Sequence, residues 1–168
     1  SIIQEITPIK YQKYDRLILP QSVKEASATL MFSDVHFGRQ VNEHEIEYFN
    51  QYDFDIACSR IYRIYEDLIK WVQFNRGAYS LRTLYLDLLG DFINDETRRE
   101  NKQTNQWPNT ITLVNSAKVL SQFILMLIPH FDKIEISGVI GNESRIPEQM
   151  PGKIQYHNYF LLIFFLIN

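Results

Sequence analysis

Apolar and polar positions alternate along the chain in blocks that predict three strands separated by two helices. Short, mostly apolar runs over 27–32, 84–89 and 133–140 have the length and composition of buried strands. Apolar residues spaced three and four positions apart predict amphipathic helices over 55–74 and 109–129. The order β-α-β-α-β favours an α/β domain in which helices join the strands of a parallel sheet.

Each predicted helix is expected to bury one face. The expected core face of the first helix comprises Ile61, Ile64, Tyr65, Leu68, Trp71 and Val72. The expected core face of the second comprises Leu113, Val114, Ala117, Leu120, Ile124, Leu127 and Ile128. The first helix also carries two opposite-charge pairs at a spacing that stabilises helices: Arg63 with Asp67, and Glu66 with Lys70.

Both ends of the chain fall outside this pattern. Residues 1–27 are predicted to form an irregular lead-in, with a short edge strand within it as the alternative, and residues 28–168 to form one domain. The run 159–167 is almost wholly apolar but would span only about half of a membrane, so we expect no membrane segment there. We expect this run to be covered by a second copy of the chain or by a C-terminal portion that the sequence lacks.

The composition indicates the class of protein and its cellular compartment, but it says little about the activity. With 45% apolar and 22% charged residues, the chain has the usual make-up of a soluble globular domain. Its net charge of -3 provides no basic field for nucleic acid, although bound cations can supply positive charge locally. The single cysteine, Cys58, cannot form an internal disulfide. We therefore expect a reducing, cytoplasmic compartment and interpret Cys58 as a small core residue.

A short polar motif follows each predicted strand. The motifs are Ser33-Asp34-Val35-His36-Phe37-Gly38, Gly90-Asp91-Phe92-Ile93-Asn94 and Gly141-Asn142-Glu143-Ser144-Arg145. Parallel strands end at one edge of their sheet, so this topology predicts a gathering there of four side chains: Asp34, His36, Asp91 and Asn142. Residues two apart in an extended backbone point to one side, so a carboxylate and an imidazole should converge on a transition metal. The alternative is an α/β domain whose polar strand ends only cap helices and turn the chain.

The three motifs, each after a strand and in this order, resemble those of the calcineurin-like metallophosphoesterases. The run from Gly141 to Arg145 is similar to a variant found in phage-type members. The resemblance implies an α/β sandwich with two divalent ions at the C-terminal ends of the strands, manganese before iron or zinc. It implies that Asp34 and His36 hold one ion, that Asp91 bridges both and that Asn142 holds the second. Asn94 lies where the family has a polar residue that supports the ligands.

The sequence departs from the family pattern in two ways. The family has a histidine after the Gly-Asn pair, whereas this chain has Glu143, which could donate a proton only if its pKa were raised. Arg145 is the candidate to balance the phosphate charge. The family also completes its metal sites with later histidines, and we predict that His44, His130 and His157 do not replace them. The first two are expected on the surface, and the third near the start of a final element.

The resulting hypothesis is hydrolysis of a phosphoester by a water that bound metal ions activate. DNA or RNA is the expected substrate class if Arg98 and Arg99 contact a phosphate backbone, while a small phosphomonoester or a phosphoprotein remains an alternative. The competing hypothesis from another class is a truncated or non-catalytic relative that binds a partner protein. Divalent-metal binding with turnover would favour the enzyme, whereas a mixed oligomer without turnover would favour the binding domain.

Overall fold

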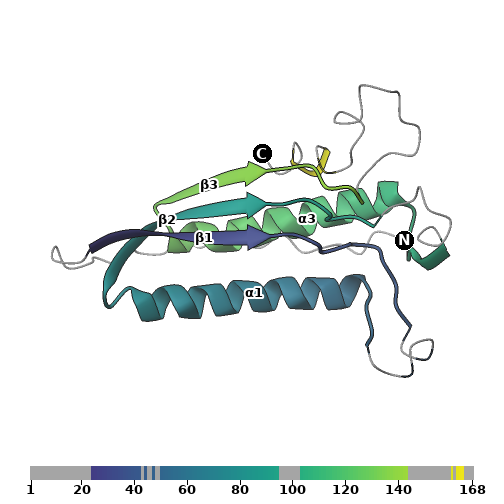
Figure 1. Cartoon of the computed structure of the whole chain (residues 1–168), viewed down its shortest axis with the longest axis horizontal. Coiled ribbons are helices and arrows are strands. Elements are labelled where there is room, and N and C mark those ends of the chain that lie inside the picture. The colour runs from purple at the N-terminus through teal and green to yellow at the C-terminus, as the bar shows by residue number, and fades with distance from the viewer. Residues whose placement is uncertain are drawn as a thin grey trace.

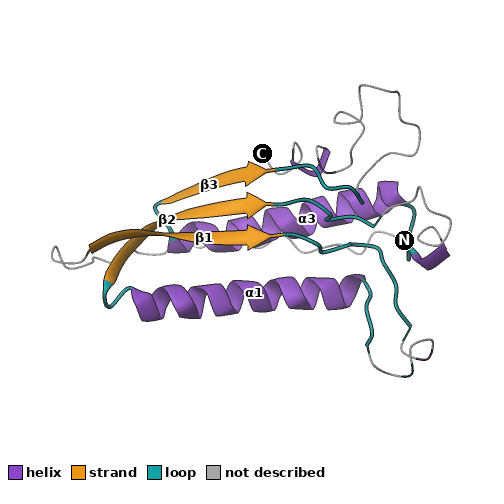
Figure 2. Cartoon of the chain, in the orientation of Figure 1, coloured by secondary structure: helices purple, strands orange, loops and turns teal. Residues whose placement is uncertain are grey.

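The computed structural model describes residues 24–42, 44, 47, 50–94, 103–143, 160 and 162–164. In this part of the chain the predicted α/β class is confirmed by a parallel three-stranded sheet and two long helices (Figures 1 and 2). The strands lie in the order β1-β2-β3, and their bounds are Lys24–Phe32 for β1, Tyr79–Leu88 for β2 and Lys133–Gly138 for β3.

Each pair of neighbouring strands is joined through a helix. Helix α1 (Phe54–Asn75) connects β1 to β2, and α3 (Asn109–Leu127) with the 3-10 turn η2 (Ile128–His130) connects β2 to β3. Helix α1 begins after Asp53, whose carboxylate accepts a hydrogen bond from the Ile56 N–H at 2.8 Å. Such a cap satisfies one of the N–H groups that a helix start leaves open.

The strands begin earlier than hydrophobicity alone predicts. Strand β1 begins at Lys24 and lies at the edge of the sheet, so for residues 24–27 the alternative of an edge strand is correct and the irregular lead-in is wrong; β2 begins at Tyr79. These early residues are paired with each other, for example Lys24 with Tyr79. Apart from the buried Leu81, most of them are exposed or polar, and ladder pairing of such residues leaves little apolar signature in the sequence.

The two helices cover one face of the sheet. Leu84 and Leu86 of β2 point into the core and are fully buried, whereas Tyr85 between them points to the other face and is 38% exposed. On β1, Ala28 is buried and Met31 is 72% exposed. Parallel sheets are usually covered on both faces, and in the described part of the chain the second face of this sheet is open.

The expected helix faces are correct in outline and wrong at particular residues. Trp71 of α1 is 51% exposed, and Val114 of α3 is 47% exposed, so neither belongs to the core. In contrast, Thr112 and Ser116 of α3 are fully buried. The Ser116 hydroxyl donates to the Thr112 carbonyl at 2.7 Å, which removes the penalty for burying it. A pattern based on hydrophobicity cannot identify such residues.

One of the two predicted charge pairs forms. Arg63 Nε lies 3.6 Å from Asp67 Oδ2, as expected. Lys70 contacts Asp67 at 3.8 Å, so the predicted pair of Lys70 with Glu66 is wrong. Asp67 is one turn from both cations and therefore takes both contacts.

Two described residues of the apolar C-terminal run are already covered by the chain itself. Phe160 is 1% exposed and stacks on Phe92 at 5.6 Å, and Ile163 is fully buried. For these two residues the expected need for an outside cover is therefore wrong. Leu162 beside them is 45% exposed.

Helix α3 and η2 together (Asn109–His130) are long and apolar enough to cross a membrane by length and composition, with a mean hydropathy of 1.7. Core helices of soluble proteins pass the same test. In this fold Leu120, Phe123 and Leu127 of α3 are buried in the core that lies against the sheet.

The expectation that His130 lies on the surface is wrong. His130 is partly buried, and its Nε2 lies 3.0 Å from the hydroxyl of Tyr65. Burial, and then the positive charge of Arg76, lower the pKa of His130 below its usual value. The folded state therefore takes up this proton less readily than the unfolded state does.

We expect the free energy of unfolding to fall as the pH drops below about 6.5, where an unfolded histidine becomes charged. His130→Gln keeps a hydrogen-bonding group without the charge and should flatten this slope between pH 7 and pH 5. Urea unfolding at a series of pH values measures the slope, with the exposed His44→Gln as control. An unchanged slope in His130→Gln would contradict the assignment.

Candidate metal centre

The loops after β1 and β2 run side by side beyond the strands. The main-chain N–H of Asp34 donates to the Gly90 carbonyl at 3.3 Å, and the N–H of His36 donates to the Asp91 carbonyl at 3.0 Å. Phe37 N–H continues the series to the Phe92 carbonyl at 2.7 Å. These hydrogen bonds fix Asp34 and His36 next to Asp91, although Asp91 follows Asp34 by 57 positions in the sequence.

The loop after β3 packs directly on the same place. Gly90 has a φ of +89°, and a Cβ there would lie 2.5 Å from the Gly141 nitrogen. A Cβ on Gly141 would overlap the Asp91 carboxylate. The Glu143 N–H donates to Asp91 Oδ1 at 2.7 Å. The three strand-end loops are therefore in contact, as the parallel topology predicts.

Backbone strain is concentrated in the predicted ligands. Asp34, His36 and Asp91 have φ values of +56°, +49° and +54°, in the left-handed region that side-chain-bearing residues rarely adopt. Each such residue costs about 1 kcal/mol or more. Strain of this kind persists only where the surrounding structure enforces it, and it clusters at functional sites.

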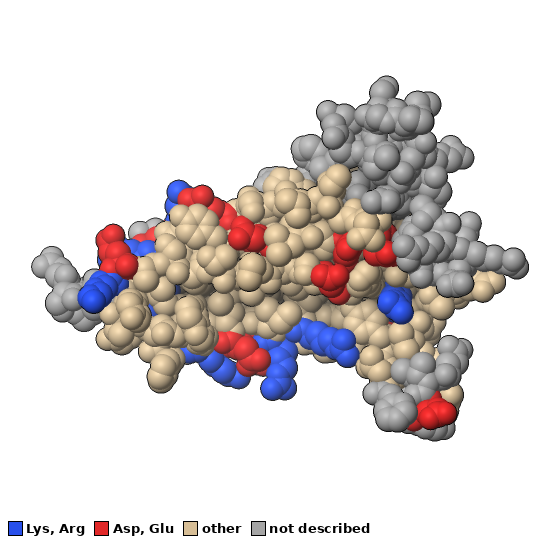
Figure 3. Space-filling view, viewed as in Figure 1, with Lys and Arg blue, Asp and Glu red and all other residues tan. Residues whose placement is uncertain are grey.

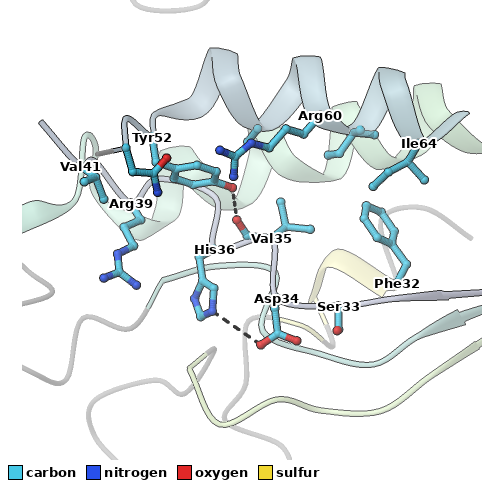
Figure 4. A pocket seen from close by; sticks show the side chains of 13 residues that line it. Phe32, Ser33, Asp34, Val35, His36, Arg39, Val41, Tyr52, Arg60 and Ile64 are labelled. Atoms are coloured by element: carbon cyan, nitrogen blue, oxygen red, sulfur yellow. Dashed lines mark hydrogen bonds and ion pairs between the residues drawn. The ribbon is translucent and has the colours of Figure 1, made fainter. Parts of the chain in front are cut away.

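Asp34 and His36 turn their side chains to the same side of the loop, and Val35 turns away (Figure 4). The juxtaposition was predicted from an extended backbone, but the left-handed conformation at both residues produces it instead. His36 Nε2 lies 3.8 Å from Asp34 Oδ1. This separation is too long for a hydrogen bond, and it is wider than that of adjacent ligands that each lie about 2.0–2.2 Å from one ion, so the two side chains would move closer together to share an ion.

Among the described residues, the other ring nitrogen of His36 lacks the hydrogen-bond partner that a buried polar atom usually has. This atom is Nδ1, which is buried. Buried polar atoms nearly always have a partner, and ligating histidines engage both ring nitrogens. The ring is thus consistent with a ligand whose surroundings are completed by further groups.

Glu143 forms hydrogen bonds with both Asn142 and Asp91. Asn142 Nδ2 donates to Glu143 Oε1 at 3.0 Å, which leaves the Asn142 Oδ1 outside this hydrogen bond. Through its main-chain N–H, Glu143 also orients the Asp91 carboxylate. The geometry therefore gives Glu143 a positioning role that the sequence did not suggest. Arg145, predicted to act beside it, lies outside the described residues, as do Arg98 and Arg99.

Asn94 is buried at 2% exposure within a network of side-chain amides. Its Nδ2 donates to Asn105 Oδ1 at 2.6 Å, and Asn109 Nδ2 donates to the Asn94 carbonyl at 3.1 Å. The network ties the loop after β2 to the start of α3. Sequence reasoning missed Asn105 and Asn109, for which the signal was their position near and at the start of a helix.

The described donors suit a metal but do not complete a site. Carboxylate, imidazole and amide oxygen together are ligands typical of manganese, iron or zinc. Within the described ranges, no group of three or more His, Cys, Asp or Glu side chains is arranged to hold an ion. Cys58 is not a substitute, because burial raises the pKa of its thiol to about 11 and keeps it protonated.

We expect Gly90→Ala to lower the free energy of unfolding by about 2 kcal/mol or more, because the new Cβ meets Gly141 and φ is positive. Gly77→Ala is the matched control. Its Cβ would meet only the Phe74 carbonyl, at 3.8 Å, so its stability should stay within about 1 kcal/mol of the parent. Chemical denaturation measures both, and equal effects at the two glycines would contradict the close approach of the loops.

The strain at His36 predicts an inverted preference between glycine and alanine. Both His36→Gly and His36→Ala remove the imidazole, but only glycine adopts a φ of +49° freely. The glycine variant should therefore be more stable by about 1 kcal/mol. At Arg63 in the middle of α1 the order should be the usual one, with alanine more stable by about 1 kcal/mol. If glycine and alanine rank in the same order of stability at His36 and at Arg63, the backbone at His36 is not strained.

Comparison of the chain with protein-family models, with curated proteins and with solved structures found no match. The likeness to the calcineurin-like metallophosphoesterases therefore rests on the three motifs and on the contact between their loops.

Proposed function

We propose that the protein is a metal-dependent phosphoesterase whose active site lies at the carboxyl edge of the sheet. The observation that carries this proposal is the strained, left-handed backbone of Asp34, His36 and Asp91 in loops that touch one another. Figure 3 supports it by showing acidic side chains gathered beyond the strand ends, whereas acidic and basic side chains are mixed along α1. A group of neighbouring carboxylates favours a bound cation.

In this proposal Asp34 and His36 hold one divalent ion, Asp91 bridges to a second ion and Asn142 binds that second ion. Two such ions would clamp the phosphate and lower the pKa of a bound water so that it attacks as hydroxide. Glu143 keeps Asp91 and Asn142 oriented through its main-chain N–H and its carboxylate. Manganese is the proposed metal, with iron or zinc as the alternatives, because the donors mix oxygen with nitrogen.

The remaining ligands are proposed to come from outside the described residues. A second copy of the chain or a further C-terminal portion would supply them, and Leu162 in the apolar run 159–167 remains exposed for such a contact. A cytoplasmic setting remains the expectation from the single cysteine. DNA or RNA is the proposed substrate class. The arginines of the neighbouring cavity, Arg39 and Arg60, bear on which part of such a substrate binds there.

A non-catalytic role in binding a partner is the second candidate. It is favoured by the open face of the sheet, where Met31 and Tyr85 are exposed on parallel strands that usually have a second cover. A stable complex with a protein partner and no turnover would support it.

The first test is a titration of the full chain with manganese by calorimetry, together with turnover of bis-p-nitrophenyl phosphate. We expect two ions to bind, and Asp91→Ala to abolish both binding and turnover, because Asp91 is the shared ligand. Asp87→Asn is the matched control. Asp87 lies near the end of β2, before the loop that carries Asp91, and its carboxylate accepts a hydrogen bond from Ser137 at 2.7 Å, so this variant should behave as the parent does.

Unchanged metal binding in Asp91→Ala would refute the proposed site. Binding without turnover would support the metal centre and reject the enzyme in favour of the second candidate.

A further inference from the structure

A cavity of about 450 Å³ lies directly beside the proposed metal centre. It is bounded by the loop after β1 on one side and by α1 on the other, and Asp34 and His36 belong to its wall (Figure 4). Cavities of about 300–1,000 Å³ typically hold organic ligands. The space is therefore suited to more than a bare phosphate group.

The inner wall of this cavity is apolar and well supported. Phe32 at the end of β1 and Ile61 on α1 line it and are buried at 5% and 4% exposure. Ile64, one turn further along α1, extends the same surface. An apolar wall with a few polar groups is the usual construction of a site for a small molecule.

Tyr52 fixes the mouth of the cavity. Its hydroxyl donates to the main-chain carbonyl of Val35, so the segment before α1 is tied to the loop that carries Asp34 and His36. Burial raises the pKa of Tyr52, and this outweighs the opposite effect of Arg60. The hydroxyl therefore remains protonated and keeps donating at neutral pH.

Two guanidinium groups border the same space. Arg60 reaches from α1 over the ring of Tyr52, with 5.0 Å between its guanidinium carbon and the ring centre. The main-chain N–H of Arg39 donates to the His36 carbonyl at 3.1 Å, which fixes Arg39 relative to the proposed metal ligand. Within the described part of the chain, neither side chain makes an ion pair with a carboxylate.

Arg63 shows that this lack of a partner is not general on α1. It lies one turn after Arg60, and its guanidinium is paired with Asp67 at 3.6 Å. Of the two arginines on α1, the one that lines the cavity is therefore the one without a carboxylate partner among the described residues. Arginine is well suited to phosphate, because its planar fork of donors can bind two oxygens at once.

We infer that this cavity binds the alcohol half of the phosphoester, and that this half carries a second phosphate held by Arg39 and Arg60. The chemical class is a nucleotide unit, a nucleoside whose planar base can lie against the apolar wall and whose sugar carries the scissile phosphate on one hydroxyl and the second phosphate on another. The inference rests on the proposed function for the position of the scissile phosphate. The binding of the second phosphate does not require the metal ions, so it is measured without them.

The test is calorimetric binding of thymidine 3′-phosphate, thymidine 5′-phosphate and thymidine to the full chain in the presence of a chelator. We expect at least one of the two nucleotides to bind about tenfold or more tightly than thymidine. Arg39→Gln and Arg60→Gln should each weaken that binding about tenfold. Arg63→Gln is the matched control and should bind as the parent does. Because Arg39 and Arg60 are exposed, urea unfolding of each variant should match that of the parent.

Several outcomes would overturn the inference. One is equal binding of thymidine and both nucleotides, and another is an equal loss in Arg63→Gln, which would indicate a general field along α1. If inorganic phosphate binds as tightly as the nucleotide, the apolar cavity wall contributes nothing to nucleotide binding. If the nucleotide result is as expected while manganese fails to bind, the proposed function fails and the phosphate site remains. If manganese binds and turnover occurs without any effect of the two arginines, only this inference fails.

Discussion

The structure depends on the close approach of three loops at one edge of the sheet. The backbone of Gly90 contacts that of Gly141, where no side chain fits between them, and the main chain of residues 34–37 follows that of 90–92. Parallel strands joined by helices bring their carboxyl ends together in any α/β protein. Here Gly90 and Gly141 carry no side chains, so the loops after β2 and β3 come into backbone contact. The main-chain N–H groups of the loop after β1 donate directly to carbonyls of the loop after β2. Asp91 then lies at the centre of the three loops.

This arrangement opposes local backbone preference with tertiary contacts. Asp34, His36 and Asp91 would each favour another conformation in isolation, and the ladder between the first two loops is what holds them. Natural sequences are locally consistent over most of their length, so conflicts that persist tend to mark function. A site whose donors are held in place before a ligand arrives loses less freedom when the ligand binds.

The sequence predicts the topology well, because each strand and helix has its own periodicity. It also predicts which motifs meet, since parallel order alone places Asp34, Asp91 and Asn142 at one edge. It does not predict the left-handed backbone, which arises from contacts between loops that are distant in the chain. For the same reason it misses the cavity, whose arginines and Tyr52 come from a loop and a helix without a shared motif. The sequence also gives no sign that Glu143 contacts both Asn142 and Asp91.

Under the proposed function, the local placement of charge accounts for a composition that gives no sign of a phosphate ligand. The net charge of -3 includes an acidic edge beyond the strand ends (Figure 3), whereas Arg39 and Arg60 line the cavity beside that edge. A phosphoester at an acidic edge is repelled unless cations intervene, whereas the rest of the ligand can be held by arginines alone. Affinity for the organic half and charge compensation at the reacting half are then properties of separate residues. Under the proposed function, such a division would let a weakly acidic protein bind an anion, because the local field dominates at short range.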